Sequence, residues 1–169
     1  LGTLIARCDV PADWRVLLIA PPDASGLSGP DEERAFLELE PMSETLTAKL
    51  CRGVLLEILP ALQEGDFETF SSALHEYGAH VGDYFSVVQG GRYAHPAMRD
   101  LAEWLSLRGL TGVGQTSWGP TLFGFCQNQA RADDFLMQIE SESKWSDCHV
   151  RIAAPKNDGA TVISPPVAM

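Results

Sequence analysis

The sequence predicts an α+β domain built around a mostly antiparallel sheet. Two short β-favouring runs, residues 3–8 and 15–20, open the chain, and several helical patterns follow before the next strands. This order lacks the regular alternation of strands and helices that is typical of a doubly wound parallel sheet. A sheet with helices packed on one face fits better. The strand, helix and strand expected between residues 120 and 153 resemble half of a ferredoxin-like arrangement.

Apolar periodicity predicts the first helices. Ser28 and Asp31 form a capping signal for a short helix that runs through about Leu39. After Pro41 the chain has an apolar stripe wide enough to face a core, and Pro60 is expected to end or kink the helix that carries it. The stripe consists of Leu46, Leu50, Val54, Leu55, Ile58, Leu59 and Leu62.

A longer helix is expected next. Asp66 is a suitable N-cap, and an apolar seam follows it as far as Val88. Because the linker to the preceding helix is short, the two helices should form an antiparallel pair with most of the seam's aromatic side chains in the core. Gly90 and Gly91 should end the long helix. Pro96 should begin another, whose buried face is Met98, Leu101, Ala102 and Leu105 and which Gly109 closes.

The remaining elements are short. We expect a strand at residues 122–128, a helix at 132–142 and a strand at 148–155. A turn at residues 156–159 (KNDG) leads into 160–164 (ATVIS), which is expected to be the hairpin partner of the preceding strand. The inward side chains of the helix are expected to be Phe135, Leu136 and Ile139.

Composition restricts the class of protein. A length of 169 residues with 45% apolar side chains suits one domain with a real core. The formal charge of −11 would repel a phosphate backbone, so neither nucleic acid nor an anionic membrane is an expected partner. No apolar run approaches the roughly 20 residues that span a bilayer, and we expect a cytoplasmic protein. Because the chain opens on Leu1 rather than Met, it is expected to be part of a longer polypeptide.

No metal site is expected. Cys8, Cys51, Cys126 and Cys148 are scattered without a CxxC pair, which favours four reduced thiols over a zinc site or a disulfide framework. The histidines of the long helix lack a second ligand at a suitable spacing, so they are expected to be exposed or to act as caps. Acidic residues are abundant and none is singled out by spacing, so the catalytic residues stay unknown.

The sequence GVGQTSWGPT, residues 112–121, is the strongest candidate for a binding segment. Glycines permit close backbone approach, and successive amides in such a loop can converge on an anion. The indole adds a flat apolar surface beside neutral hydrogen-bonding groups. A glycine-rich connection whose indole fills the core would give the same composition, so both interpretations stay open. The candidate ligand-binding residues here are Gly112, Gly114, Gln115, Thr116, Ser117, Trp118 and Gly119.

Five segments together carry a resemblance to a known family. GVGQTSWGPT, with EPMSETLTAKL (40–50), ILPAL (58–62), FSVVQGGRY (85–93) and VPADWRVLL (10–18), resembles the C-terminal half of beta-ribofuranosylaminobenzene 5'-phosphate synthases. These synthases belong to the GHMP kinase superfamily. The resemblance covers nearly the whole chain, and it implies a ferredoxin-like GHMP C-terminal domain spanning residues 1–169. In an intact protein that domain would form a cleft with an N-terminal domain that is missing here.

The resemblance also implies a chemistry. Synthases of this kind condense phosphoribosyl pyrophosphate with a para-substituted benzoate, with loss of carbon dioxide and pyrophosphate, on the route to methanopterin-type carriers. The resemblance places the superfamily's third motif on residues 112–119. The backbone of these residues would then lie near the phosphorylated small molecule. No cofactor is implied for this chain alone, although Mg²⁺ could accompany the phosphorylated ligand in the intact protein. The isolated chain is expected to be inactive because it would hold half of the site.

Two further candidates follow the long helix. Arg92 is the basic residue placed in a glycine-rich segment, where it could contact phosphate, and Tyr93 could stack on an aromatic ring. Ser117 and Trp118 stand where kinases of the superfamily usually have small residues, which favours a synthase over a kinase. Two alternatives remain open: a GHMP small-molecule kinase that uses ATP, and a non-catalytic ferredoxin-like module for binding or dimerisation, including a homodimer.

Overall fold

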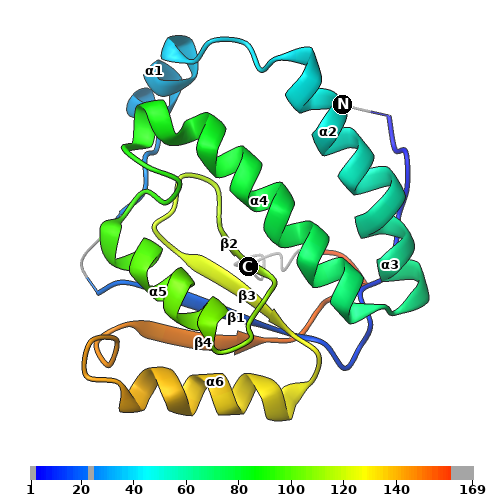
Figure 1. The fold of residues 1–169 in the computed structure, drawn as a ribbon, viewed down its shortest axis with the longest axis vertical. Helices are drawn as coiled ribbons and strands as arrows, with labels where there is room; N and C mark the ends of the chain where they lie inside the picture. Colours follow the sequence, from blue (N-terminus) through cyan, green and yellow to red (C-terminus); the bar gives the residue numbers. More distant parts are fainter. Residues whose placement is uncertain (1–2, 23–24, 161–169) are drawn as a thin grey trace, which may run out of the picture.

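The structure, a computed structural model, describes residues 3–22 and 25–160. Its centre is a four-stranded sheet made of β1 (Arg15–Ala20), β2 (Val113–Gln115), β3 (Leu122–Cys126) and β4 (His149–Ala153). The strand order is β2-β3-β1-β4, and every neighbouring pair is antiparallel (Figure 1). The predicted α+β fold with a mostly antiparallel sheet is confirmed.

Two strand predictions differ from the structure. Residues 3–8 were expected to form a strand, but they form no ladder with any described residue. Instead the Asn157 side chain holds the backbone just after them, accepting from Val10 N at 3.0 Å and donating to Val10 O at 3.0 Å. β propensity was therefore insufficient where no neighbouring strand was available. The predicted hairpin partner at 160–164 lies almost wholly outside the described residues, although the turn before it is present.

Helices account for most of the remaining described chain. They lie above and below the sheet in Figure 1, with α6 running beneath β4. Their bounds are α1 Pro30–Glu38, α2 Glu44–Gly53, the π-helical segment η1 Val54–Ile58, α3 Leu59–Glu64, α4 Phe67–Gln89, α5 Pro96–Leu107 and α6 Gln129–Ser141.

The helix boundaries mostly follow the predicted signals. The Asp66 carboxylate caps α4 by accepting from Thr69 N at 3.1 Å, and this bond lowers the pKa of Asp66. The capping signal at Ser28 was wrong, because Gly29 occupies the N-cap of α1 with φ of 59° and no side-chain cap bond. The positive φ explains why glycine rather than serine occupies this position.

The predicted break at Pro60 takes the form of a π-helical segment. Leu59 N donates to Val54 O, five residues back, in place of the α-helical carbonyl four residues back. Pro60 itself has no N–H, and the widened turn comes just before it. The helical path thus continues from α2 into α3 without a stop.

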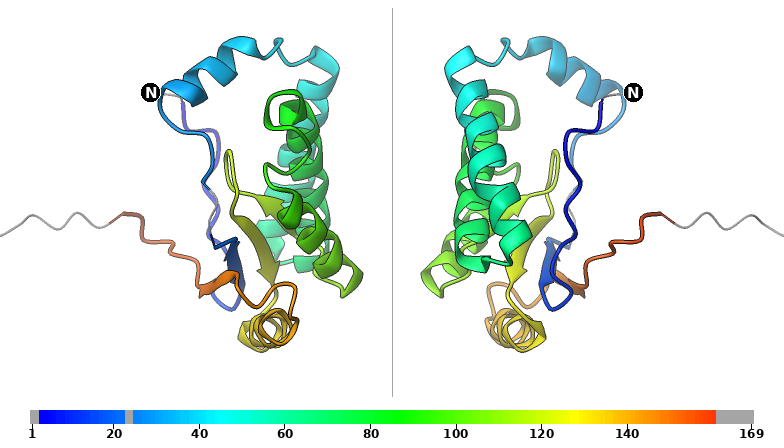
Figure 2. Two further views of the ribbon diagram at one scale, coloured as in Figure 1. Left: turned by 90° about the vertical axis from the view of Figure 1, so that its left-hand side faces the viewer. Right: turned by 90° about the vertical axis from the view of Figure 1, so that its right-hand side faces the viewer.

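The larger of two apolar clusters joins the sheet to α5 and α6. Leu17 and Ile19 of β1 and Leu122 of β3 are fully buried against it. The predicted inner face of α5 is confirmed, since each of its four residues is buried, as are Phe135 and Ile139 of α6. Figure 2 shows the sheet between the N-terminal segment on one side and the green helices α4 and α5 on the other, with α6 below it.

The second cluster joins α4 to the η1–α3 region. Trp14, Phe70 and Ile58 form its centre, and Trp14 contacts both Phe67 and Phe70. The antiparallel pairing of these helices was predicted correctly. The prediction that Leu55 faces the core was wrong: it is 50% exposed, because the π-helical turn alters the spacing of the stripe. Much of the α4 seam is half-buried rather than buried.

Candidate functional site

A small recess lies between α4, the β2–β3 hairpin and the segment that follows α4. Its volume is about 150 Å³. The apolar part of its lining comes from Leu74, Tyr77, Val81, Phe85, Tyr93 and Phe123. The polar part comes from Gln89, Arg92, Gln115 and Ser117.

Three glycines let α4 and the hairpin come together at this recess. A Cβ at Gly114 would lie 2.4 Å from Cζ of Phe123, so the Phe123 ring lies directly against the β2 backbone. A Cβ at Gly82 would lie 2.6 Å from the carbonyl oxygen of Arg92. Gly78 faces Gly114, with 3.9 Å between its hypothetical Cβ and the Gly114 Cα. Close packing therefore accounts for these glycines without any need for positive φ.

Gln115 links the two chain segments that border the recess. Its Oε1 accepts from Ala94 N at 2.7 Å, and its Nε2 donates to Ser117 O at 3.1 Å and to Gln89 Oε1 at 3.2 Å. Gln89 Nε2 in turn donates to Arg92 O at 3.0 Å. The two amides thus fix the 92–94 segment against the β2–β3 loop, and both N–H donors of the Gln115 amide are used in this role.

Arg92 is paired with a carboxylate from its own neighbourhood. Its Nε and Nη2 donate to the two carboxylate oxygens of Asp83, each at 2.8 Å. This hydrogen-bonded pairing lowers the pKa of Asp83 and raises the pKa of Arg92. Such a two-pronged pair fixes the plane of the guanidinium, and its Nη1 remains for another acceptor.

Tyr93 differs from Arg92 in its surroundings. Burial raises the pKa of the Tyr93 hydroxyl, so it is a neutral phenol at physiological pH. This hydroxyl forms no hydrogen bond with another described residue. Tyr93 therefore offers the recess an unengaged group that can donate or accept.

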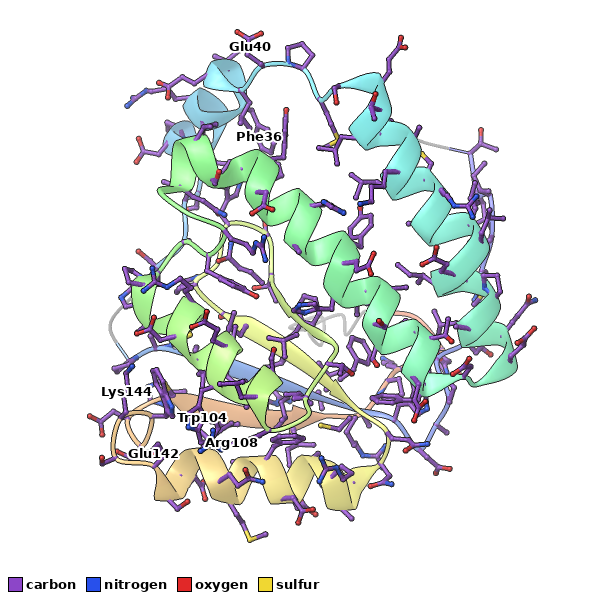
Figure 3. The ribbon with its side chains drawn as sticks, viewed as in Figure 1. Phe36, Glu40, Trp104, Arg108, Glu142 and Lys144 are labelled. Carbon is purple, nitrogen blue, oxygen red and sulfur yellow. The ribbon has the colours of Figure 1, made fainter. Side chains whose placement is uncertain are left out.

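Trp118 lies outside the recess, in an aromatic cluster that reaches it through Phe85. The Trp118 ring is 5% exposed and makes edge-to-face contacts with Phe85 of α4, at 4.8 Å between centroids, and Phe36 of α1, at 5.3 Å. Its Nε1 donates to Glu32 Oε1 at 3.0 Å. Figure 3 shows Phe36 on α1 at the side of α4, far from Trp104 and Arg108 at the end of α5.

The turn at the tip of the hairpin is held by local bonds. Thr116 N donates to Thr121 O at 3.0 Å, and Gly119 N donates to Thr116 O at 2.7 Å. Ser117 and Gly119 both have positive φ, 43° and 68°. Gly26 packs on the same turn, where a Cβ would lie within 3 Å of two of its carbonyl oxygens.

The structure brings some of the predicted site residues together and separates others. Those that line the recess are Arg92, Tyr93, Gly114, Gln115 and Ser117. Those that do not line it are Gly112, Thr116, Trp118 and Gly119. Gly112 instead packs against Ser71 and Phe125, where its Cβ would lie 3.1 and 3.3 Å from theirs.

Sequence reasoning missed the contribution of α4 to this site. Gly78 and Gly82, four residues apart on one helix face, were a usable signal, because glycine pairs at that spacing permit close packing. Phe85 was placed only in the segment 85–93 that carries the resemblance, and Phe123 only in a predicted strand. Nothing in the sequence indicated that both would meet at one recess.

Larger cavities lie elsewhere. One of about 420 Å³ is bordered by Ser71, Thr111 and Arg131, and a more open one of about 630 Å³ lies beside Trp14 and Gln129. Neither contains any of the predicted site residues, so the recess at α4 is the candidate site. Within the described ranges no group of three or more His, Cys, Asp or Glu side chains is placed to hold a metal ion. Nor is any described helix long and apolar enough to cross a bilayer.

A family comparison identifies the fold. The sequence profile of the GHMP kinases C terminal family matches residues 58–143, just over half of the chain. The chain belongs to the GHMP kinase C-terminal family. The match spans α4, the segment that follows it and the β2–β3 hairpin, which together build the recess.

The curated relatives are synthases. A beta-ribofuranosylphenol 5'-phosphate synthase of Archaeoglobus fulgidus is 28% identical over 165 residues, covering 94% of this chain and 47% of the relative. The same-named protein of Methanothermobacter thermautotrophicus is 27% identical over 120 residues, covering 71% of this chain and 35% of the relative. The chain spans about half the length of the first of these GHMP relatives. The resemblance predicted from sequence is confirmed.

A solved structure has the same fold. Homoserine kinase from Cytophaga hutchinsonii superposes with a TM-score of 0.57, covering 89% of this chain and 44% of the kinase, at 12% identity. Identity this low supports a shared GHMP fold and carries no information on substrate.

Proposed function

We propose that this chain is the C-terminal half of a beta-ribofuranosylphenol or beta-ribofuranosylaminobenzene 5'-phosphate synthase. The whole protein would condense phosphoribosyl pyrophosphate with a para-substituted benzoate, releasing carbon dioxide and pyrophosphate. The alignment of 94% of the chain with the Archaeoglobus fulgidus synthase carries this proposal. The likeness to homoserine kinase does not compete with it, because that likeness extends to the fold alone.

The site would be shared with an N-terminal GHMP domain. The recess contributed by this chain has a volume of about 150 Å³, below the roughly 300 Å³ at the lower end of drug-sized ligand sites. A phosphoribosyl donor would therefore need most of its contacts from the other domain. In this proposal Gly114, Gln115 and Ser117, with Arg92 and Tyr93, form one wall of the cleft.

The net charge of the chain also supports a site that is shared with the N-terminal domain. The chain carries −11 formal charges, and Arg92, the basic residue at the recess, is already paired with Asp83. A donor with three phosphoryl groups would require positive charge from the N-terminal domain or from Mg²⁺ bound with the ligand. Methanopterin-type cofactor biosynthesis would be the setting of the reaction.

The test uses the protein that contains both halves. It is incubated with phosphoribosyl pyrophosphate, Mg²⁺ and either 4-hydroxybenzoate or 4-aminobenzoate, and the products are measured by mass spectrometry together with carbon dioxide release. The proposal expects a ribosylated, decarboxylated product from at least one acid. Absence of product, together with no calorimetric heat from phosphoribosyl pyrophosphate, would contradict it.

Parallel reactions test the two alternatives. Consumption of ATP with phosphorylation of a small alcohol would favour a GHMP kinase. A stable dimer of this chain, with no thermal response to any of these ligands, would favour a non-catalytic module.

A further inference from the structure

The recess at α4 has the dimensions of one aromatic ring. A cavity of about 150 Å³ lined by apolar side chains can hold a benzene molecule, and this recess has the same volume. Its lining includes the rings of Tyr77, Phe85, Tyr93 and Phe123. Edge-to-face and offset contacts with such rings favour a flat aromatic ligand over a sugar.

The recess is open on the α4 side at Gly78. Gly78 on α4 and Gly114 on β2 both line the cavity and contribute no side chain to it. At Gly78 a Cβ would meet nothing closer than 3.9 Å, so a methyl group there would fit the fold while occupying the cavity. At Gly78 the space is therefore left free by the residue type, whereas at Gly114 the Phe123 ring occupies the place of a side chain.

The polar groups at the recess are few and specific. The Gln115 amide uses both of its N–H donors, on Ser117 O and Gln89 Oε1, and its Oε1 accepts from Ala94 N. Arg92 keeps Nη1 for an acceptor, and the side-chain hydroxyls of Tyr77, Tyr93 and Ser117 form no hydrogen bond with another described residue. A ring that carries one carboxylate and one hydroxyl or amino group matches this short set of groups.

The side chains that line the recess are poorly suited to phosphoribosyl pyrophosphate. Of the described residues that line the recess, only Arg92 is charged, and its charge is offset by Asp83. Several phosphoryl groups would find neither the room nor the cations they need. The aromatic acid and the phosphoribosyl donor thus have different requirements, and this recess meets those of the acid.

We propose that this recess is the subsite for the aromatic acid, holding a single para-substituted benzoate ring against Phe85, Phe123 and Tyr93. The assignment rests on the proposed synthase function for the identity of the acid. It places the ring on this half of the protein and the phosphoribosyl donor chiefly on the other half.

The decisive variant is Gly78→Ala in the protein that contains both halves. The added methyl would overlap the ring, so we expect the Kd for 4-hydroxybenzoate to rise at least about tenfold, while the Kd for phosphoribosyl pyrophosphate stays the same. Gly53→Ala is the matched control, because Gly53 is also helical, has nothing within 4 Å of its Cβ position and lies outside the recess. Thermal unfolding checks that both variants are folded.

A second variant tests the polar contact. Tyr93→Phe removes one hydroxyl and keeps the ring, so we expect about a two- to tenfold weaker Kd for 4-hydroxybenzoate and little change for a benzene derivative without a polar substituent, such as toluene. Binding is measured by calorimetry or saturation-transfer NMR, with adenosine as a competitor. Displacement of the acid by adenosine would overturn the assignment in favour of a nucleotide base.

The outcomes separate this inference from the proposed function. If the protein makes the ribosylated product and Gly78→Ala changes neither Kd nor KM for the acid, the subsite is wrong and the synthase function stands. If no product forms but Gly78→Ala still weakens binding of the acid, the subsite stands and the synthase function is wrong.

Discussion

The indole Nε1–H of Trp118 donates a hydrogen bond to Oε1 of Glu32, 3.0 Å away, and this bond joins the β2–β3 loop to helix α1. Phe36, one helical turn further along α1, contacts the same indole. Helix α1 has nine residues, and a helix this short is marginal by itself in water. We therefore expect the order of α1 to depend on this contact. The same contact holds the β2–β3 loop, in which Ser117 lines the recess.

The variant Trp118→Phe tests the dependence of α1 on the indole. Phenylalanine keeps an aromatic ring but loses the donor to Glu32, a bond to a carboxylate worth about 1.5–3 kcal/mol at most. We expect amide hydrogen exchange to accelerate across residues 31–38 and to stay unchanged in α5. Unchanged protection of 31–38 would mean that α1 is held by other contacts.

The variant Gly114→Ala tests the close approach of Phe123 to β2. The new Cβ would lie 2.4 Å from Cζ of that ring, so the ring or the strand must shift. Overpacking of this kind costs about 1–3 kcal/mol, which urea denaturation can measure. Gly53→Ala is the control and should be neutral or slightly stabilising, because its Cβ would meet nothing within 4 Å.

Cys126 should be unreactive in the folded protein. Burial raises the pKa of its thiol to about 12, so at pH 8 only about one molecule in 10⁴ carries the thiolate. Iodoacetamide should modify the exposed Cys51 first and Cys126 only after unfolding. The check is peptide mass spectrometry over time, and early labelling of Cys126 would contradict its burial.

The same raised pKa has a consequence for stability. The unfolded thiol ionises near pH 9 while the folded thiol stays protonated, so this group's contribution to folding is intact below about pH 9 and is lost as the pH rises towards 12. Cys126→Ala should reduce the loss of stability over that range, as measured by urea denaturation at several pH values.

Asp83 should titrate below an ordinary carboxyl group. The hydrogen bonds from Arg92 lower the pKa of Asp83, so its stabilising effect is present above pH 3.8 and is lost as the pH falls through the folded pKa. Carbon NMR of the side-chain carboxyl measures this directly. Because the pair is partly exposed, Asp83→Asn should cost less than about 1 kcal/mol at pH 7. A titration at or above pH 3.8 would rule out the pairing.

Much of the fold was predictable from local patterns. The spacing of Met98, Leu101 and Leu105 predicted the buried face of α5, and Asp66 predicted where α4 begins. These predictions succeeded because periodicity and capping depend on residues within one or two turns. Residues 3–8 failed because a strand needs a partner, and β propensity carries no information on whether one is present.

The candidate site was predictable only in part. The segment 112–121 and the pair Arg92 and Tyr93 were identified from composition and resemblance, and five of these residues line the recess. Phe85 and Phe123 could not be identified, because 38 positions separate them in the sequence and only the packing of α4 on the hairpin brings them together.

The sequence by itself determined the elements, the α+β class and the family, because each depends on residue type and order. Only the tertiary structure decided what the glycines and the indole do. Gly114 allows a ring to lie against a strand, Gln115 joins two segments, and Trp118 holds α1 instead of lining the recess. These roles depend on distances between residues far apart in the chain, which are set by packing of the whole domain.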